Sequence, residues 1–125
     1  MNFFETLLRE KEGRYFAEAE GLSLPVPEGF KLASGRAVTA GLRPTDITLG
    51  QGDRGEARGH LSAQVLATEI HGAEVLIKAK VGASTYHFQS HLTQKPELGQ
   101  VLSCSYALSA LQLFDMETGV ALPRG

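Results

Sequence analysis

The stretch LSAQVLATEIHGAEVLIKAKV, residues 61 to 81, decides the fold. Apolar and polar side chains alternate over its first half, which predicts a strand over 61–70, and over its second half, which predicts another over 74–81. His71-Gly72-Ala73 between them has the composition of a tight turn, so the stretch predicts an antiparallel hairpin. The residues expected on one face of the first strand are Leu61, Ala63, Val65, Ala67 and Glu69.

The same period of two recurs on both sides of this hairpin. Fourteen glycines and five prolines supply the turns between the alternating segments. Pro25 and Pro27 indicate that one strand lies at a sheet edge or ends early, because proline donates no ladder hydrogen bond. With the hairpin there are eight or nine short strands, which predict an all-β barrel or sandwich. The other segments predicted to be strands are 14–20, 22–26, 36–42, 45–49, 85–90, 100–108 and 111–114.

The first residues fit two conformations. A helix over 2–12 would be capped by Asn2 and would place Phe3, Phe4, Leu7 and Leu8 on one face. Phe3 and Phe4 also fit the start of an edge strand. We favour extended structure over 2–5.

Length, charge and cysteine content limit the class of protein. The 125 residues fit a single domain, 1–125, whose halves 1–50 and 60–122 are joined by a glycine-rich loop over 51–59. The net charge is −2, so nothing favours nucleic-acid binding. Cys104 is the single cysteine, which fits a reducing, cytoplasmic location, and its apolar surroundings predict a buried, unreactive thiol. The sequence has neither an apolar run of about 20 residues nor a signal-peptide pattern at its start.

Catalytic motifs are absent from the sequence. It contains no Gly-x4-Gly-Lys-Ser/Thr phosphate loop and no Gly-x-Ser-x-Gly nucleophile elbow. His87 and His91 have a spacing that suits a metal on a helix, but they fall in a predicted strand and loop, so we interpret them as surface histidines. The sequence predicts a non-enzymatic domain without a cofactor or metal of its own.

Two segments are candidates for contact with a partner. The first is the predicted hairpin turn, where Glu69 and Glu74 flank Gly72 and are expected to be exposed. The second is the segment after the last predicted strand. Phe114 there is interpreted either as a plug of the core or as part of a docking surface.

The turn after Phe114 has its own signature. Asp115 and Gly119 are expected to fix it, because an aspartate side chain readily bonds backbone amides two or three residues on. The turn would then present Met116 and Glu117 to a partner. A separate, competing set of residues would suit a small oxyanion or sugar ligand: Arg43, Lys78, Lys80, Ser103 and Ser105.

Four blocks of sequence follow one another over residues 1–122. They are Met1 to Phe4, Gly41 to Ile47 with its Arg43-Pro44 and Asp46, the hairpin residues Val65, Glu69, Gly72 and Glu74, and Leu113 to Leu122 with its Gly119. In this order the blocks resemble the C-terminal regulatory domain, also called the TOBE domain, of ATP-binding subunits of ABC importers for sugars and glycerol-3-phosphate. Thr45 and Gln112 depart from that family's usual glutamate and histidine.

The resemblance implies a small OB-like barrel with a regulatory and dimerisation role and no catalysis. It implies that ATP and Mg²⁺ bind a separate ATPase domain. The implied partners are a second copy of the subunit, that ATPase domain, membrane permease subunits and a regulatory protein, in the cytoplasm at the inner membrane. Our hypothesis is that one candidate partner or dimer patch combines the hairpin with the segment after the last strand. Its residues are Glu69, Gly72, Glu74, Phe114, Asp115 and Met116, with Arg43, Pro44, Asp46 and Gly119 as structural residues.

Overall fold

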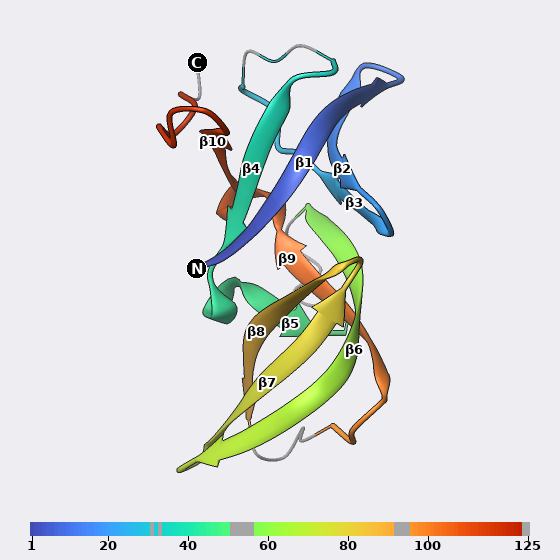
Figure 1. The fold of residues 1–125 in the computed structure, drawn as a ribbon, viewed down its shortest axis with the longest axis vertical. Coiled ribbons are helices and arrows are strands. Elements are labelled where there is room, and N and C mark those ends of the chain that lie inside the picture. The colour runs from blue at the N-terminus through green and yellow to red at the C-terminus, as the bar shows by residue number, and fades with distance from the viewer. Residues whose placement is uncertain (31, 33, 51–56, 92–95, 124–125) are drawn as a thin grey trace.

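The fold consists of two antiparallel five-stranded sheets (Figure 1). A computed structural model describes residues 1–30, 32, 34–50, 57–91 and 96–123. The first sheet has the strand order β10-β4-β1-β2-β3 and the second β5-β9-β6-β7-β8. The elements are β1 (Asn2–Lys11), β2 (Arg14–Ala19), β3 (Leu22–Pro25), β4 (Ala37–Leu42), η1 (Pro44–Asp46), β5 (Ile47–Leu49), β6 (Arg58–His71), β7 (Glu74–Val81), β8 (Ser84–His91), β9 (Val101–Ala107), η3 (Leu108–Ala110) and β10 (Gln112–Asp115).

The expected all-β class is confirmed, with ten strands in the described residues instead of eight or nine. The chain begins with a strand, so extended structure near its start is confirmed and the helical alternative is wrong. Phe4 and Leu8 of β1 face the core, whereas Phe3 and Leu7 face outward. A helix would have put these four side chains on one side. In a strand successive side chains point to opposite faces, so only every second one faces the core. The expected edge position of β3 is also confirmed.

The two sheets do not follow the two halves of the sequence. Ile47–Leu49 leaves the first half to pair with β9, and Gln112–Asp115 returns from the second half to pair with β4. Each short strand covers an edge that would otherwise stay unpaired. Of the loop expected over 51–59, residues 51–56 lie outside the described part, and Arg58 and Gly59 already belong to β6.

A β-bulge changes which residues of β6 face the core. Val65 pairs with Ala79, but the next pair is Ala67 with Lys78, so Leu66 is an extra residue. An extra residue reverses the alternation beyond it. Ala67 and Glu69 are therefore exposed, and their predicted place on the face of Leu61 is wrong.

The second sheet curls until its two edge strands, β5 and β8, lie side by side. The edge of β8 is also held by Asn2, which is 7% exposed. The Asn2 side chain donates to the His87 carbonyl at 2.7 Å and accepts from the His87 N–H at 2.9 Å. The Asn2 side chain thus pairs with both the backbone N–H and the carbonyl of His87, as a neighbouring strand would. No helix among the described residues is long and apolar enough to cross a membrane.

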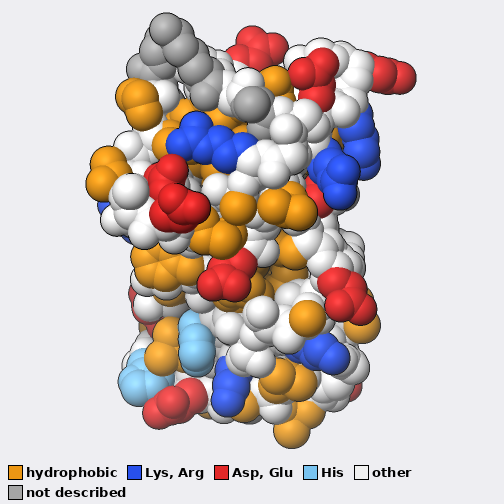
Figure 2. Space-filling view, turned by 45° about the horizontal axis from the view of Figure 1, so that its top comes forward, with side chains coloured by type: hydrophobic (Ala, Val, Ile, Leu, Met, Phe, Trp, Pro, Cys, Tyr) orange, Lys and Arg blue, Asp and Glu red, His pale blue; other side chains and the backbone are white. Residues whose placement is uncertain are grey.

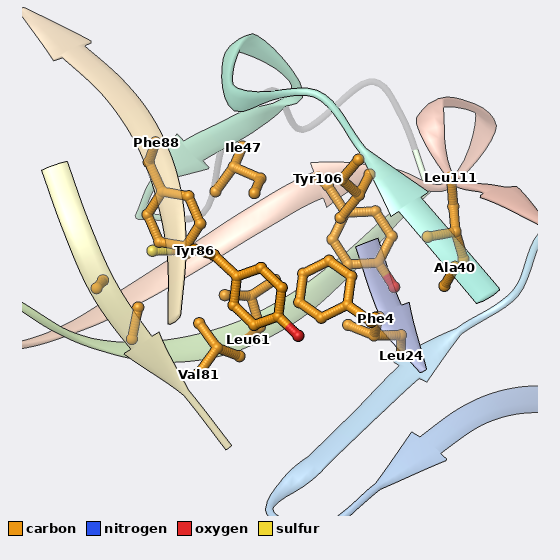
Figure 3. Packing of buried hydrophobic residues seen from close by; sticks show 14 of the residues in the cluster. Phe4, Leu24, Ala40, Ile47, Leu61, Val81, Tyr86, Phe88, Tyr106 and Leu111 are labelled. Carbon is orange, nitrogen blue, oxygen red and sulfur yellow. The ribbon is translucent and has the colours of Figure 1, made fainter. Parts of the chain in front are cut away.

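Tyr106 links the second sheet to the first. Its ring is fully buried, and its hydroxyl donates to the carbonyl of Pro25 on β3 at 2.9 Å. The ring lies directly over Gly59, its pairing partner on β6, where a Cβ would overlap the ring. In Figure 3 Phe4 lies between Tyr106 and Tyr86, and the Phe4 and Tyr86 rings stack with centroids 4.0 Å apart. One aromatic layer therefore contains residues of both sheets.

We expect Gly59→Ala and Tyr106→Phe to destabilise the fold by different routes. The methyl group added at Gly59 displaces the Tyr106 ring and costs about 1–3 kcal/mol, as overpacking does. Removing the hydroxyl leaves the Pro25 carbonyl without its donor and costs about 1–3 kcal/mol. Urea unfolding followed by circular dichroism measures both. Ser62→Ala, at an exposed position of the same strand, is the control, expected within about 0.5 kcal/mol of the parent; equal stability of all four proteins would contradict this account of the sheet contact.

Candidate functional site

Asp115 organises the turn that follows β10. Its Oδ1 accepts hydrogen bonds from the N–H groups of Glu117 and Thr118, both at 2.9 Å. Its Oδ2 forms an ion pair with Arg36 of the loop before β4 at 3.1 Å. The Thr118 N–H and then Arg36 lower the pKa of the Asp115 carboxyl. The carboxylate thus fixes the turn and fastens it to the first sheet.

This turn presents its side chains to solvent. Met116 is 36% exposed, and Glu117 is exposed as well. The Gly119 N–H donates to the Asp115 carbonyl at 2.8 Å, which closes the turn at the position the sequence indicated.

Phe114 belongs to the outer face of the first sheet. Leu113, which pairs with Ala40, is the buried residue of β10, so Phe114 must point the other way. It is half-buried, with its ring edge-on to Phe3 at a centroid distance of 5.9 Å. The interpretation of Phe114 as a core plug is therefore wrong, and the interpretation as a surface residue fits its position.

The hairpin turn at Gly72 carries exposed charges. Glu74 pairs with His71 and Glu69 with Leu76, so the two carboxylates are not directly opposite each other. Glu69 instead lies 3.0 Å from the His71 Nε2, with both side chains more than half exposed. This arrangement is that of a solvated hairpin end.

The two candidate contact segments lie far apart. In Figure 1 the β6–β7 turn is at the lower end of the long axis, and β10 with its following turn is near the upper end. The structure therefore does not bring Glu69, Gly72 and Glu74 together with Phe114, Asp115 and Met116. If both segments bind partners, they form two separate surfaces.

The Arg43-Pro44-Thr45-Asp46 block is a structural turn. Asp46 accepts a hydrogen bond from the Arg43 N–H at 3.0 Å, and its own N–H donates to the Arg43 carbonyl at 2.9 Å. These bonds close η1, which redirects the chain from β4 in the first sheet to β5 in the second. The structural role of this block is therefore to carry the chain from the first sheet to the second.

The residues considered for a small oxyanion or sugar do not converge. Ser105 is fully buried and accepts a hydrogen bond from the Arg58 Nε at 3.0 Å. Ser103, Lys78 and Lys80 are exposed on the strands of the second sheet, and Arg43 lies at η1. The set is thus spread over exposed strand positions, a buried position and η1.

The other titratable residues considered in the sequence analysis are His87, His91 and Cys104. His87 is exposed, and the side chain of His91 lies outside the described residues. Among the described residues no three His, Cys, Asp or Glu side chains are grouped as metal ligands would be. Cys104 is fully buried, and burial raises the pKa of its thiol to about 11. A thiol with that pKa is protonated at neutral pH, so the predicted unreactive cysteine is supported.

The sequence reasoning missed the outer face of β1. Phe3 is 55% and Leu7 43% exposed, with Glu5 and Arg9 alternating between and beyond them. We name Phe3, Glu5, Leu7, Arg9 and Phe114 together the β1 face. Continuing the period of two from Phe3 to Arg9 could have found it, but the helical alternative hid that pattern. Figure 2 shows hydrophobic side chains on the visible side interspersed with charges of both signs.

Comparison with known proteins identifies the fold first. The structure resembles that of the cytoplasmic molybdate-binding protein ModG, solved with molybdate bound. The TM-score is 0.68 at 19% identity, over 95% of each chain. Two five-stranded sheets, the second of them curled, and this likeness define an all-β domain of the OB type.

The sequence comparisons then identify the relatives. Residues 1–47 match the family model described as the MalK OB fold domain. The chain is 32% identical over 108 residues to the sn-glycerol-3-phosphate import ATP-binding protein UgpC of Escherichia coli (strain K12), covering 86% of this chain and 29% of that protein. It is 30% identical over 119 residues to UgpC of Salmonella paratyphi A, covering 95% of this chain and 32% of that protein. The chain is thus homologous to the C-terminal region of UgpC, and it spans about a third of the length of these relatives.

We expect Asp115→Asn to remove a pH-dependent part of the stability. A carboxyl whose pKa is lowered by folding stabilises the protein above its ordinary value of 3.8, and that contribution is lost as the pH falls through the lowered pKa. The variant should therefore be less stable than the parent at pH 7, with the difference shrinking below about pH 4. Denaturant unfolding at several pH values measures this.

Glu117→Gln is the matched control, since it removes a charge from the same turn but leaves the hydrogen bonds to Asp115 intact. A stability difference between Asp115→Asn and the parent that stays constant from pH 7 to pH 3 would contradict the assignment.

Proposed function

We propose that this chain is the regulatory, non-catalytic part of the ATP-binding subunit of an ABC importer for sugars or glycerol-3-phosphate. The observation that carries the proposal is the alignment of 86% of the chain with less than a third of UgpC. The relative is named for ATP-dependent import, and the aligned portion here is an OB-type domain without a phosphate loop. ATP and Mg²⁺ are then assigned to a separate ATPase domain of the subunit.

The proposed setting follows from that role. The subunit would act in the cytoplasm, attached to the inner membrane through permease subunits. Its partners would be its own ATPase domain, the permeases, a second copy of the subunit and a regulatory protein. The face shown in Figure 2 carries charges of both signs, and the net charge of −2 gives no support to nucleic-acid binding.

The β1 face fits a second copy of the chain. The side chains that point outward along β1 are apolar, acidic, apolar and basic in turn: Phe3, Glu5, Leu7 and Arg9. A two-fold axis through Leu7 sets two such strands antiparallel. Leu7 then meets Leu7, and Glu5 of each copy meets Arg9 of the other. A two-fold contact uses the same patch twice, so a patch with this order is complementary to itself.

The small side chains beside β1 support the same proposal. On the outer side β4 carries the small residues Ala37, Thr39 and Gly41, and the Phe114 ring and the Met1 sulfur lie over Gly41, the pairing partner of Phe3. The Phe3 and Phe114 rings form one apolar border along the strand. Because the hairpin turn lies at the far end of the molecule, Glu69, Gly72 and Glu74 remain available in such a dimer. We assign them to a different partner, the regulatory protein.

Self-association tests the proposed dimer contact. We expect the chain to associate reversibly in analytical ultracentrifugation, and Leu7→Lys to raise the dissociation constant at least about ten-fold, because it places two like charges at the centre of the contact. Ile70→Lys changes a similarly exposed apolar side chain at the distant hairpin and is the matched control.

A charge exchange separates the specific contact from general hydrophobic association. Glu5→Arg alone should weaken association, and Glu5→Arg combined with Arg9→Glu should restore it. Equal weakening by Ile70→Lys and Leu7→Lys, or no restoration by the double exchange, would contradict the two-fold contact. The regulatory role is tested separately, by the ATPase rate of a full-length subunit that carries Leu7→Lys.

A further inference from the structure

A hollow of about 390 Å³ lies where the first sheet is open beside β1. β1 pairs with β4 from Asn2 to Leu7, but with β2 only from Leu7 onward. Beside residues 3–5, the β2–β3 turn and the β7–β8 turn line the hollow in place of a neighbouring strand. Its volume is in the range of small-molecule sites, about 300–1,000 Å³. Because the hollow lies at an open strand edge, residues from both faces of β1 line it.

Two carboxylates stand on the two sides of this opening. Glu5 lies two residues before Leu7, so it shares the outer face of β1 with that residue. Glu20 lies two residues beyond Glu18, the pairing partner of Leu7, and the same register would set it opposite Glu5. In the described part of the chain neither carboxylate forms an ion pair, and no lysine, arginine or histidine of that part lines the hollow. Two carboxylates without a counter-ion at one opening attract a cation.

The inner wall carries a hydroxyl that lacks a hydrogen-bond partner. Tyr86 of β8 is only 7% exposed, yet no described residue bonds its hydroxyl. Since no fully inaccessible side-chain oxygen of the described residues is left without a partner, the hydroxyl is the part of Tyr86 that reaches the hollow. In Figure 3 it points away from Phe88. A bound molecule can supply the missing hydrogen bond.

Two contacts bring these polar groups to one place. The Tyr86 ring stacks on that of Phe4 with centroids 4.0 Å apart, and Glu5 is the next residue along β1. On the other side the Glu20 carbonyl oxygen meets the backbone of Gly82, in the turn that leads into β8. Glu5, Glu20 and Tyr86 therefore border the same opening.

We propose that this hollow binds a small organic cation, an ammonium group on an apolar body. Glu5 and Glu20 accept its charge-assisted hydrogen bonds, and the Tyr86 hydroxyl accepts the third that an ammonium group can donate. The apolar body packs against Phe3, which is 55% exposed, and the half-buried Leu22.

The site is complete within one copy of the chain, so the proposal goes beyond the regulatory role and does not depend on it. Glu5 also belongs to the β1 face, and a second copy bound there would compete with the cation for this carboxylate. Binding is therefore measured at a chain concentration well below the dissociation constant of self-association.

Titration of the ¹⁵N-labelled chain with benzylamine at pH 7, where the amine is protonated, tests the proposal by NMR. We expect saturable shifts of amides in the β2–β3 and β7–β8 turns. Benzyl alcohol, which lacks the charge, and ammonium chloride, which lacks the ring, should each bind at least about ten-fold more weakly. Glu20→Gln and Tyr86→Phe should each raise the dissociation constant at least about three-fold. Glu28→Gln changes an exposed carboxylate in a different turn and is the matched control, expected to bind as the parent does.

The stability of Tyr86→Phe separates lost binding from lost folding. Its hydroxyl has no partner in the described protein, so the variant should unfold at the same urea concentration as the parent, unlike Tyr106→Phe.

Three outcomes would overturn the proposal: no saturable shifts with benzylamine, benzyl alcohol or ammonium chloride binding as tightly as benzylamine, or parent-like binding by either Glu20→Gln or Tyr86→Phe. The proposed importer role fails on a different result, an unchanged ATPase rate in the full-length subunit, so the two failures are distinguishable.

Discussion

The hydrogen bond from the Tyr106 hydroxyl to the Pro25 carbonyl is the contact on which the arrangement of the two sheets depends. It reaches from the middle of the second sheet to the edge strand of the first, and the bare backbone of Gly59 gives the ring its room. Asn2 fastens β1 to the edge of β8. A third contact joins two turns, where a Cβ on Gly82 would lie 2.5 Å from the Glu20 carbonyl oxygen, so backbone meets backbone. Together these contacts fix the distance between the hairpin turn at one end and the β1 face and Asp115 turn on the other sheet.

Much of the fold could be predicted from local sequence patterns. Strict alternation located β7 to the residue, and the glycine and proline positions located most turns. Alternation alone could not locate the bulge after Val65, because the extra residue is defined by the partner strand. It also could not assign β5 and β10 to their sheets, since strand pairing between distant segments leaves no local pattern. The start of the chain is ambiguous in the sequence, because the same four apolar residues fit a helix. The pairing of β1 with β2 and β4 decides for the strand.

In the candidate site, too, some features could be predicted from the sequence and others required the structure. Residue types and spacing predicted the exposure of Glu69, Glu74 and Met116 and the turn at Asp115. Exposure and turns of this kind depend mainly on residues that are near in sequence. Whether the hairpin and Phe114 share a surface depends on how the two sheets are placed along the long axis, and that arrangement keeps them apart (Figure 1). The alternation in β1 could have indicated the outward side chains of that strand, but the position of Phe114 beside Phe3 required the structure, because β1 and β10 are distant in sequence. Homology to UgpC supports the proposed setting in an importer, whereas the surfaces proposed for contact come from this domain's own residues.

The central claim is that the contacts around Tyr106, Asn2 and Gly82 make the two sheets one cooperative unit, and native-state hydrogen exchange tests it most directly. The claim predicts that the most protected amides of β1 and β2 and those of β6 and β7 open with the same free energy, equal to that of global unfolding. Opening of either sheet at a free energy lower by about 2 kcal/mol or more, with the other still protected, would contradict it.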